Sequence, residues 1–362
     1  MRAALFTEHG GPEVLRYDDA PDPAPGPGEV LVEVEAVTIN HGPDTVVRDG
    51  NFRIQMPLPH VSGSDPAGTL IAVGEGVDDG LVGLRVGVEP IIACGECDFC
   101  LAGAGENYCR NWRLLGVHRW GGRAEYVAVP AANVVPLPDT VTFEQAACLG
   151  MAYLSTYHGL VRKADLRSDD TLLVLGAGGG VGVAAIQIAK EVGARVLAGT
   201  REPWKAERAR EIGADVVVNC GQEGWPDEVR EATDGRGVSV LFDNVGPATW
   251  SSSVSLLDRG GRFVCCGATT GFELTVDVVA LYRNHVTAFF YMCGPRADLV
   301  ELVRLVGDGR FDPVIDSRYP LSEAAAAEAR LAAGEQFGKI VLVPDWKLDR
   351  QAARFQAAQR SV

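Results

Sequence analysis

The sequence predicts an α/β protein in which a β-rich part precedes a domain built on a parallel sheet. The first 140 residues contain short β-like runs interrupted by Gly and Pro, a pattern typical of an all-β, barrel-like domain. From about residue 143, helical stretches alternate with apolar strands, which indicates a parallel sheet. A chain of 362 residues with 47% hydrophobic content supplies cores for about two domains.

The predicted elements follow in chain order. The β-like runs of the first part are residues 30–37, 68–74, 85–88 and 125–129. The second part has a buried strand at 171–175, a glycine-rich turn, a helix at 183–193 and a second strand at 195–199. After about residue 295 the pattern predicts helices at 299–306 and 322–333, a strand at 339–343, and an amphipathic, partly frayed tail at 345–362.

Composition excludes several classes of partner. A net charge of −15 argues against binding to nucleic acid or to an anionic membrane surface. The chain has no apolar run long enough to span a membrane and no signal-peptide pattern at its start, so we expect a cytoplasmic protein. Five of the nine cysteines are scattered in apolar stretches, which indicates thiols of a reducing compartment and not a disulfide framework.

The remaining cysteines form the most specific motif of the chain. Cys94, Cys97, Cys100 and Cys109 have the spacing C-x2-C-x2-C-x8-C, and four thiolates in one short loop can surround Zn2+ tetrahedrally. Buried thiols or an iron–sulfur cluster are the alternatives. The bacterial ferredoxin run has a shorter last gap and a Pro after its fourth Cys, whereas Arg110 follows Cys109 here. We therefore predict one structural zinc ion.

A dinucleotide-binding turn follows the strand at 171–175. The segment 176–182 (GAGGGVG) lies between this strand and a helix, inside a βαβ unit. Glycines let the backbone approach a pyrophosphate, and the helix N-terminus presents free N–H groups and the positive end of the helix dipole. A glycine-rich turn of some other α/β protein is the alternative. The cofactor residues predicted here are Gly176, Gly178, Gly179, Gly180, Val181 and Gly182.

The end of the second strand favours NADPH over NADH. NAD sites place an Asp or Glu there to hold the ribose 2′-hydroxyl, but this chain has Thr200 and Arg201, with Lys205 one helical turn later. A cationic pair can hold the 2′-phosphate of NADPH, and the nearest carboxylate, Glu202, lies beyond the strand end. Arg201 could instead be a solvated surface charge.

With these motifs in hand, the chain resembles the medium-chain dehydrogenase/reductase superfamily, which includes zinc alcohol dehydrogenases and quinone or enoyl reductases. The resemblance implies a GroES-like β domain over residues 1–157 and 294–362, with the zinc lobe at 94–109, and a Rossmann doubly wound domain over 158–293. It also implies a substrate bound between the domains, a cofactor contact at Gly267, and a homodimer paired through an edge strand near 287–292. The resemblance is carried by the segments 1–6, 63–68 (GSDPAG), 212–215, 242–246 (FDNVG), 260–267 and 338–342.

The resemblance fails at the catalytic zinc of the alcohol dehydrogenases. Where that family has its first Cys, this chain reads TINH at 38–41; Gly-His-Glu is replaced by Gly-Ser-Asp at 63–65, and the third ligand by Ala152. A catalytic zinc needs about three protein ligands, so we expect none. His41, His60 and Asp65 are the alternative metal set. An additional residue near Gly42 leaves the position of Asp44 open.

Without that zinc, the resemblance favours hydride transfer to a carbon that is already activated. A conjugated enone or a quinone accepts hydride at a carbon and moves the negative charge to an oxygen that hydrogen bonds can stabilise. The candidate catalytic residues are Asn40, Ser64, Asp65 and Tyr153, with Tyr153 or a water as the proton donor. Apolar side chains expected near the substrate favour an apolar small molecule; these are Val46, Met56, Trp120, Tyr291 and Met292.

Three functions therefore remain open from the sequence. The preferred one is an NADPH-dependent reductase of an activated double bond or quinone, which includes tailoring enzymes and reductive cyclases of secondary metabolism. A zinc alcohol dehydrogenase with rearranged ligands is the second. A non-catalytic nucleotide-binding regulator is the third, because the glycine turn alone does not demonstrate turnover.

Overall fold

The computed structural model describes residues 1–51 and 56–347 and divides into two compact units. The first unit comprises Met1–Met151, Pro295–Asp308 and Ile315–Val362; the second comprises Ala152–Gly294 and Gly309–Val314. The division after residue 151 lies within the helical segment that joins the units, somewhat before the limit of 157 that the sequence suggested, and the exact domain limits stay a prediction. The predicted tail lies outside the described residues from residue 348 onward.

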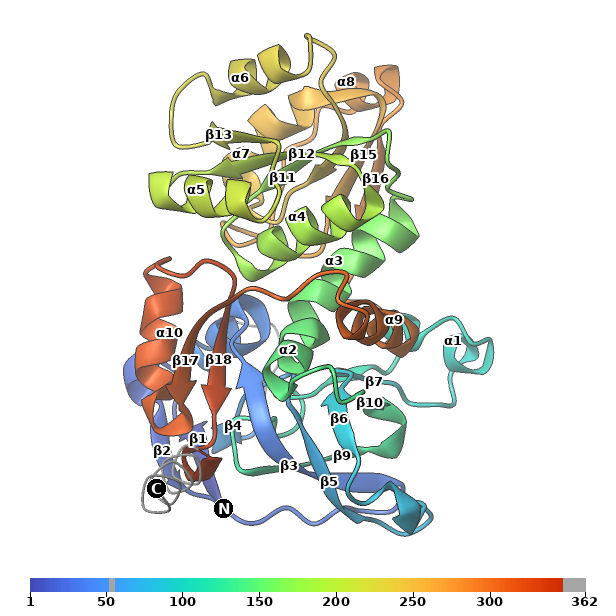
Figure 1. Cartoon of the computed structure of the whole chain (residues 1–362), viewed down its shortest axis with the longest axis vertical. Coiled ribbons are helices and arrows are strands. Elements are labelled where there is room, and N and C mark those ends of the chain that lie inside the picture. Colours follow the sequence, from blue (N-terminus) through green and yellow to red (C-terminus); the bar gives the residue numbers. More distant parts are fainter. Residues whose placement is uncertain (52–55, 348–362) are drawn as a thin grey trace, which may run out of the picture. The chain divides into compact units, whose positions relative to one another are not determined.

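The first unit is built mainly on antiparallel β-structure, with one parallel pair, β17–β18 (Figure 1). Its largest sheet has the order β10-β6-β5-β3-β18-β17, with β9 also paired to β3; β2-β1-β4 form a second sheet and β7-β8 a two-stranded ribbon. The strands are β1 (Arg2–Phe6), β2 (Arg16–Asp19), β3 (Glu29–Thr38), β4 (His60–Val61), β5 (Ala67–Val73), β6 (Arg85–Val88), β7 (Ile91–Ile92), β8 (Arg113–Leu114), β9 (Tyr126–Pro130), β10 (Val134–Pro136), β17 (Ile315–Pro320) and β18 (Lys339–Val343).

Strand β3 shows why this part of the chain forms a half-covered sheet. Its residues alternate between apolar and charged types, and Val30, Val32 and Val34 are fully buried while the intervening residues are only partly covered. This period of two places one row of side chains in the core. At the carboxyl end of β3 the pairing passes to β18, with Val341 opposite Thr38. The end of β3 is therefore the point where segments from both ends of the chain meet.

The helices of the first unit are few. They are α1 (Asp98–Leu101), α2 (Phe143–Cys148), α9 (Arg296–Gly307) and α10 (Ala324–Ala332). Helix α2 begins with a capping box, in which Thr142 accepts from the Gln145 N–H and the Gln145 side chain accepts from the Thr142 N–H. The helical segment then continues through two π-helical stretches, Leu149–Tyr153 and His158–Lys163, on either side of α3 (Leu154–Tyr157).

The second unit is a parallel six-stranded sheet with the order β13-β12-β11-β14-β15-β16, flanked by helices (Figure 1). Counted within the unit this order is 3-2-1-4-5-6, that of the Rossmann fold. The strands are β11 (Thr171–Leu175), β12 (Arg195–Thr200), β13 (Val216–Asn219), β14 (Val238–Phe242), β15 (Leu257–Cys265) and β16 (Thr287–Phe290). The helices are α4 (Gly180–Val192), α5 (Pro203–Glu211), α6 (Trp225–Ala232), α7 (Pro247–Ser253) and α8 (Val278–Arg283).

The predicted fold class is confirmed. The strands at 171–175 and 339–343 have the limits expected from the sequence, and the helix expected at 183–193 is α4. Apart from Thr171 and Ser239, the residues of strands β11 and β14 are apolar and buried, as expected for a parallel sheet covered on both faces. No helix among the described residues is long and apolar enough to cross a bilayer.

Candidate functional site

The glycine turn of the second unit has room only for glycine at its closest point. A Cβ at Gly182 would lie 2.3 Å from the carbonyl oxygen of Gly176 and 2.8 Å from the Cα of Ala177. Gly176 itself has a φ of +69°, a left-handed conformation that favours glycine. The turn is closed by the Gly179 N–H, which donates to the Gly176 carbonyl at 3.0 Å. The backbone of 176–182 thus has the open, tightly turned form that a pyrophosphate requires.

Helix α4 supplies the anion-binding end of this site. It starts at Gly180 with Gly179 as its N-cap, and no side chain caps its first N–H groups. Four unpaired N–H groups at a helix start attract a phosphate. Lys205, from α5, lies over the same turn, because a Cβ at Gly178 would be 2.6 Å from the Lys205 Cδ. The structure therefore brings the predicted glycines and Lys205 together.

The two residues before α5 have different environments. Thr200 ends β12 and is 8% exposed, whereas Arg201 lies on the surface. The carboxylate of Glu202, at the N-cap of α5, is also exposed. No carboxylate side chain therefore ends β12 at the position where NAD-binding proteins hold the ribose 2′-hydroxyl.

Asn244 is a cofactor-site candidate that reasoning from the sequence missed. It follows β14, and its Oδ1 accepts the Cys266 N–H at 2.6 Å, while a Cβ at Gly267 would lie 3.9 Å from its own Cβ. Its Nδ2 is buried and has no hydrogen-bond partner among the described residues. An orphaned buried donor at the carboxyl ends of β14 and β15 fits a polar group of a bound nucleotide. Asn244 lies in the FDNVG segment at 242–246, which the sequence analysis used only as evidence of the family resemblance.

The four predicted zinc ligands converge in the first unit. All four sulfur atoms lie within 4.8 Å of one another. The Sγ–Sγ distances are 3.5 Å for Cys97–Cys100, 4.0 Å for Cys97–Cys109 and 3.5 Å for Cys94–Cys109. Tetrahedral zinc with Zn–S bonds of ~2.3 Å places sulfur atoms about 3.8 Å apart. The donor set therefore fits one zinc ion.

The lobe also provides backbone donors that favour thiolates. The N–H groups of Arg110 and Cys100 lower the pKa of Cys97 to about 6, and those of Glu96 and Cys97 lower the pKa of Cys94. Desolvation and the neighbouring Cys97 sulfur raise the pKa of Cys100 to about 12. Gathering four thiolates thus requires a cation, and Zn2+ supplies it when it is bound, by direct sulfur coordination.

The zinc lobe (residues 94–109) contacts the start of α9. The carboxylate of Glu106 accepts the Arg296 N–H at 3.0 Å, and a Cβ at Gly105 would lie 3.1 Å from the Pro295 side chain. Glu106 lies only three residues before Cys109 in the sequence. The conformation of the lobe therefore affects the first turn of α9.

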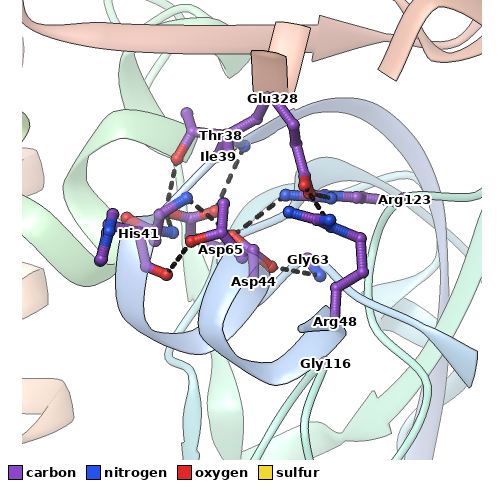
Figure 2. Close-up of polar contacts among 12 residues, drawn as sticks. Thr38, Ile39, His41, Asp44, Arg48, Gly63, Asp65, Gly116, Arg123 and Glu328 are labelled. Atoms are coloured by element: carbon purple, nitrogen blue, oxygen red, sulfur yellow. Dashed lines mark hydrogen bonds and ion pairs between the residues drawn. The ribbon is translucent and has the colours of Figure 1, made fainter. Parts of the chain in front are cut away.

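Two of the predicted catalytic residues, Asn40 and Asp65, meet at the end of β3, and Figure 2 shows Asp65 beside Thr38 there. Asp65 is 1% exposed and accepts hydrogen bonds from the Thr38 N–H at 3.2 Å and the Thr38 hydroxyl at 2.6 Å. Its Oδ2 also accepts from Asn40 Nδ2 at 2.9 Å. The Asn40 Oδ1 accepts from Lys339 Nζ at 2.6 Å. Lys339 was not a candidate from the sequence, where it was only the first residue of a strand.

The additional residue near Gly42 is absorbed by a π-helical turn, His41–Val46. A π-turn holds one more residue than an α-turn, and such insertions occur often at functional sites. Asp44 is consequently buried, and it accepts from the Asn40 N–H at 2.7 Å and the Gly63 N–H at 2.9 Å. Burial raises the pKa of Asp44, although the Arg123 guanidinium at 3.3 Å opposes this shift. The structure thus defines the position of Asp44, which the sequence left open.

Arg123 and Glu328 extend this cluster into a buried ionic network (Figure 2). The Glu328 carboxylate of α10 contacts Arg123 Nη1 and, at 2.6 Å, Arg48 Nε. The exposed fractions are 0% for Glu328, 0% for Arg123 and 3% for the Arg48 side chain. Arg48 also donates to the Gly10 carbonyl at 2.6 Å. The network thus ties the π-turn to α10.

Ser64 and the two histidines do not join a metal-binding group in the part of the chain that the structure describes. There, the four cysteines form the one cluster of three or more candidate metal ligands. His60 is fully buried, its Nε2 lies 3.0 Å from the Gly116 carbonyl, and burial lowers its pKa. His41 is exposed. The Ser64 hydroxyl is buried without a hydrogen-bond partner among the described residues.

Tyr153 has the environment of a structural residue in the second unit, so the structure argues against it as the proton donor. Its side chain is fully buried, and its hydroxyl donates to the Gln187 Oε1 at 2.5 Å and accepts from the Val314 N–H at 3.2 Å. The ring stacks on Phe311 with centroids 5.8 Å apart. These contacts fix Gly309–Val314 to the second unit. A hydroxyl that already donates one hydrogen bond and accepts another within the protein is poorly placed to protonate a substrate.

Two family models match the chain. Residues 26–139 match the alcohol dehydrogenase GroES-like domain, and residues 180–308 match the zinc-binding dehydrogenase domain. The chain belongs to the medium-chain dehydrogenase/reductase superfamily. Pyridine-nucleotide and zinc binding are typical of this superfamily, and the chain is one of its oxidoreductases.

Relatives of this superfamily member cover nearly its whole length. A curated NAD-dependent alcohol dehydrogenase of Sulfurisphaera tokodaii is 33% identical over 95% of this chain and 100% of its own. A quinone oxidoreductase of Rattus norvegicus is 30% identical over 95% of this chain and 98% of its own. A crystal structure titled NAD-dependent alcohol dehydrogenase has a TM-score of 0.90 and 39% identity, covering 95% of this chain and 99% of that one. The relatives thus include both alcohol dehydrogenases and quinone oxidoreductases.

Proposed function

We propose that this superfamily member is an NADPH-dependent reductase that transfers hydride to a conjugated double bond or a quinone without a catalytic zinc. The main support for this proposal is that Asp65 and Asn40 are hydrogen-bonded to protein groups. Three donors occupy the Asp65 oxygens, and Asn40 stands where the alcohol dehydrogenases of the superfamily have their first Cys ligand. A substrate for such a site must contain its own electron sink, because no Lewis acid is provided.

The second unit supports the choice of NADPH. A bound nicotinamide nucleotide would supply the hydride, held by the glycine turn, the start of α4 and the Asn244 amide. Arg201 and Lys205 offer two cations for the 2′-phosphate. Some relatives carry the name NAD-dependent, so the preference rests on these side chains of this chain and on the absence of a carboxylate at Thr200.

The first unit supplies the means to stabilise charge on the substrate. Hydride addition to an enone or a quinone places negative charge on an oxygen, and a directed N–H donor stabilises it. Asn40 is half-buried and fixed at both ends of its amide. The buried Ser64 hydroxyl offers a second donor. We leave Tyr153 out of the proton transfer and assign that proton to solvent.

An alcohol dehydrogenase is the second candidate, because several relatives have that name. Alcohol oxidation in this superfamily relies on a metal that lowers the pKa of the alcohol. The two candidates therefore differ in a countable property: one zinc ion per chain for the reductase and two for the dehydrogenase.

We further propose that the protein pairs with a second copy through β16. This strand is the edge of the parallel sheet, and its residues are mostly exposed. An uncovered edge strand offers free backbone groups to another strand. The neighbouring helix α8 exposes Val278 and Tyr282 at 66% and 61%, and Phe290 of the strand is 61% exposed. The cysteines, none of which forms a disulfide, favour a reducing compartment such as the cytoplasm.

Isotope transfer tests the reaction directly. NADPH deuterated stereospecifically at C4 is incubated with a panel of enones and quinones, and the products are analysed by NMR and mass spectrometry. We expect the label on the β carbon, or on a more distant conjugate carbon, of an enone, and stoichiometric reduction of a quinone. Rapid oxidation of saturated alcohols, with enones and quinones left unreacted, would favour the alcohol dehydrogenase instead.

A further inference from the structure

The side-chain amide of Asn40 is held in one orientation by charges on both sides. Lys339 Nζ donates to the Asn40 Oδ1 at 2.6 Å, and the Asn40 Nδ2 donates to Asp65 Oδ2 at 2.9 Å. Turning the amide over would place its N–H groups against an ammonium and its oxygen against a carboxylate, which have no matching donors and acceptors. The amide orientation is thus fixed by its partners.

Both partners of Asn40 are themselves rigidly held. The Lys339 side chain is 3% exposed and also donates to the Ile39 carbonyl at 3.0 Å. Asp65 is bound twice by Thr38. Lys339 is the first residue of β18, which pairs with the end of β3. This strand pairing positions the Lys339 ammonium beside Asn40. The Lys339 Nζ lies 3.9 Å from Asp65 Oδ2. The two charges therefore flank one amide.

We propose that Lys339 and Asp65 are positioning residues that aim the second Asn40 N–H at the oxygen of a carbonyl or quinone substrate. This inference rests on the proposed reductase function. An amide nitrogen has two hydrogens, and Asp65 accepts one of them. A cation on the amide oxygen draws electron density from the nitrogen, and hydrogen bonds in a chain polarise one another. The remaining N–H is then a stronger donor than it would be without Lys339.

The chemical step needs this donor where negative charge develops. Hydride brings two electrons to the β carbon, the carbon–carbon π pair shifts toward the carbonyl, and the oxygen becomes an oxyanion. A proton from solvent then adds to the α carbon, or to the quinone oxygen, and completes the two-electron reduction. A directed N–H at that oxygen stabilises the charge more in the transition state than in the substrate. Lys339 contributes through Asn40 and is not required to touch the substrate.

The chain offers a matched control for loss of a buried cation. Arg48 is also buried and ion-paired, but it contacts Glu328 and the Gly10 carbonyl and not the Asn40 side chain. Lys339→Met removes the charged Nζ and keeps the chain as far as the ε position, and Lys339→Arg keeps the charge. Arg48→Met removes a comparable charge away from the amide. A general loss of packing would affect Lys339→Met and Arg48→Met alike.

The experiment is a double-mutant cycle on Lys339 and Asn40, with kcat and KM measured for 2-cyclohexen-1-one and 1,4-benzoquinone. Removing one oxyanion donor costs on the order of 100-fold in kcat, so we expect Asn40→Ala near that loss and Lys339→Met about tenfold or more. The double variant should be no slower than Asn40→Ala, because the two residues act as one unit. KM for NADPH should not change, and Lys339→Arg should recover most of kcat. Arg48→Met should lower thermal stability and keep kcat.

Multiplicative losses in the double variant, or wild-type kcat in Lys339→Met, would overturn the positioning role. A crystal structure of Lys339→Met provides a readout independent of turnover: the Asn40 amide should leave its present orientation. If it stays in place, the inference is wrong whatever the substrate is. If the wild-type protein reduces neither probe but the amide moves in Lys339→Met, the proposed substrate class fails and the positioning role holds.

Discussion

Replacing Glu328 with Gln tests the buried ionic network at its most enclosed point. The Glu328 side chain is 0% exposed and contacts Arg123 and, at 2.6 Å, Arg48. The network joins two carboxylates (Asp44 and Glu328) to two cations (Arg48 and Arg123). Gln keeps the shape and removes one negative charge, and it turns an amide N–H toward a guanidinium. Removing one partner of a buried pair costs about 3–5 kcal/mol, so we expect a loss of this size.

Urea denaturation measures this loss, with hydrogen exchange of α10 amides as a second probe because the two units can unfold separately. Glu335→Gln is the control: its carboxylate lies 3.5 Å from Arg330, and the side chain is 63% exposed. Exposed pairs contribute at most about 1 kcal/mol, so this variant should behave like the wild type. If Glu328→Gln also stayed within about 1 kcal/mol of the wild type, the network would not be a stabilising element and the reasoning would fail.

Four further predictions concern the zinc, the cofactor and the assembly. Elemental analysis of protein purified without added metal should give about one zinc per chain, and a ratio near two would contradict a metal-free catalytic centre. Removing that zinc should increase hydrogen exchange both in residues 94–109 and at the start of α9, because Glu106 caps the Arg296 N–H. Arg201→Ala should weaken NADPH binding by about 10- to 100-fold, from the ~1.5–3 kcal/mol of a charge-assisted contact, and equal loss for NADH would show that Arg201 does not contact the phosphate. Light scattering should give a dimer, and Phe290→Lys on the edge strand should shift it to monomer; an unchanged mass would place the interface elsewhere.

The sequence alone predicted the features whose contacts lie between residues close together in the chain. The glycines of 176–182 lie within one turn, and the steric limits at Gly182 come from Gly176 and Ala177. The four cysteines span one loop, so their spacing alone predicted their convergence. The β-like run at 30–37 likewise predicted a strand, which is β3 in the structure. In each case the relevant distances are fixed by a few neighbouring residues.

The contacts of the buried polar residues in the first unit could not be predicted in the same way, because these contacts are long-range. Arg48 and Glu328 are 280 residues apart, and Lys339 and Asn40 are 299 apart. Their meeting depends on β18 pairing with β3, which the sequence does not specify. The hydrogen bonds of Tyr153, which argue against a role as proton donor, were unpredictable for the same reason, since its hydroxyl partners Gln187 and Val314 are distant in sequence. Aligned position identified the residue and gave no information about its hydrogen bonds.

Under the proposed function, the charges around Asn40 would let a site without a catalytic metal stabilise negative charge on a substrate. A zinc ion would act on a substrate oxygen directly, as a Lewis acid with two charges. Lys339 carries one charge and is fully engaged by Asn40 and Ile39, so it acts through the amide. Such a donor is too weak to lower the pKa of a saturated alcohol into the neutral range, but it suffices for an oxygen that already receives charge by conjugation. If the proposed function is correct, the arrangement of Lys339, Asn40 and Asp65 would favour substrates with an electron sink, as would the replacement of the zinc-ligand positions by Asn40, Ser64 and Ala152.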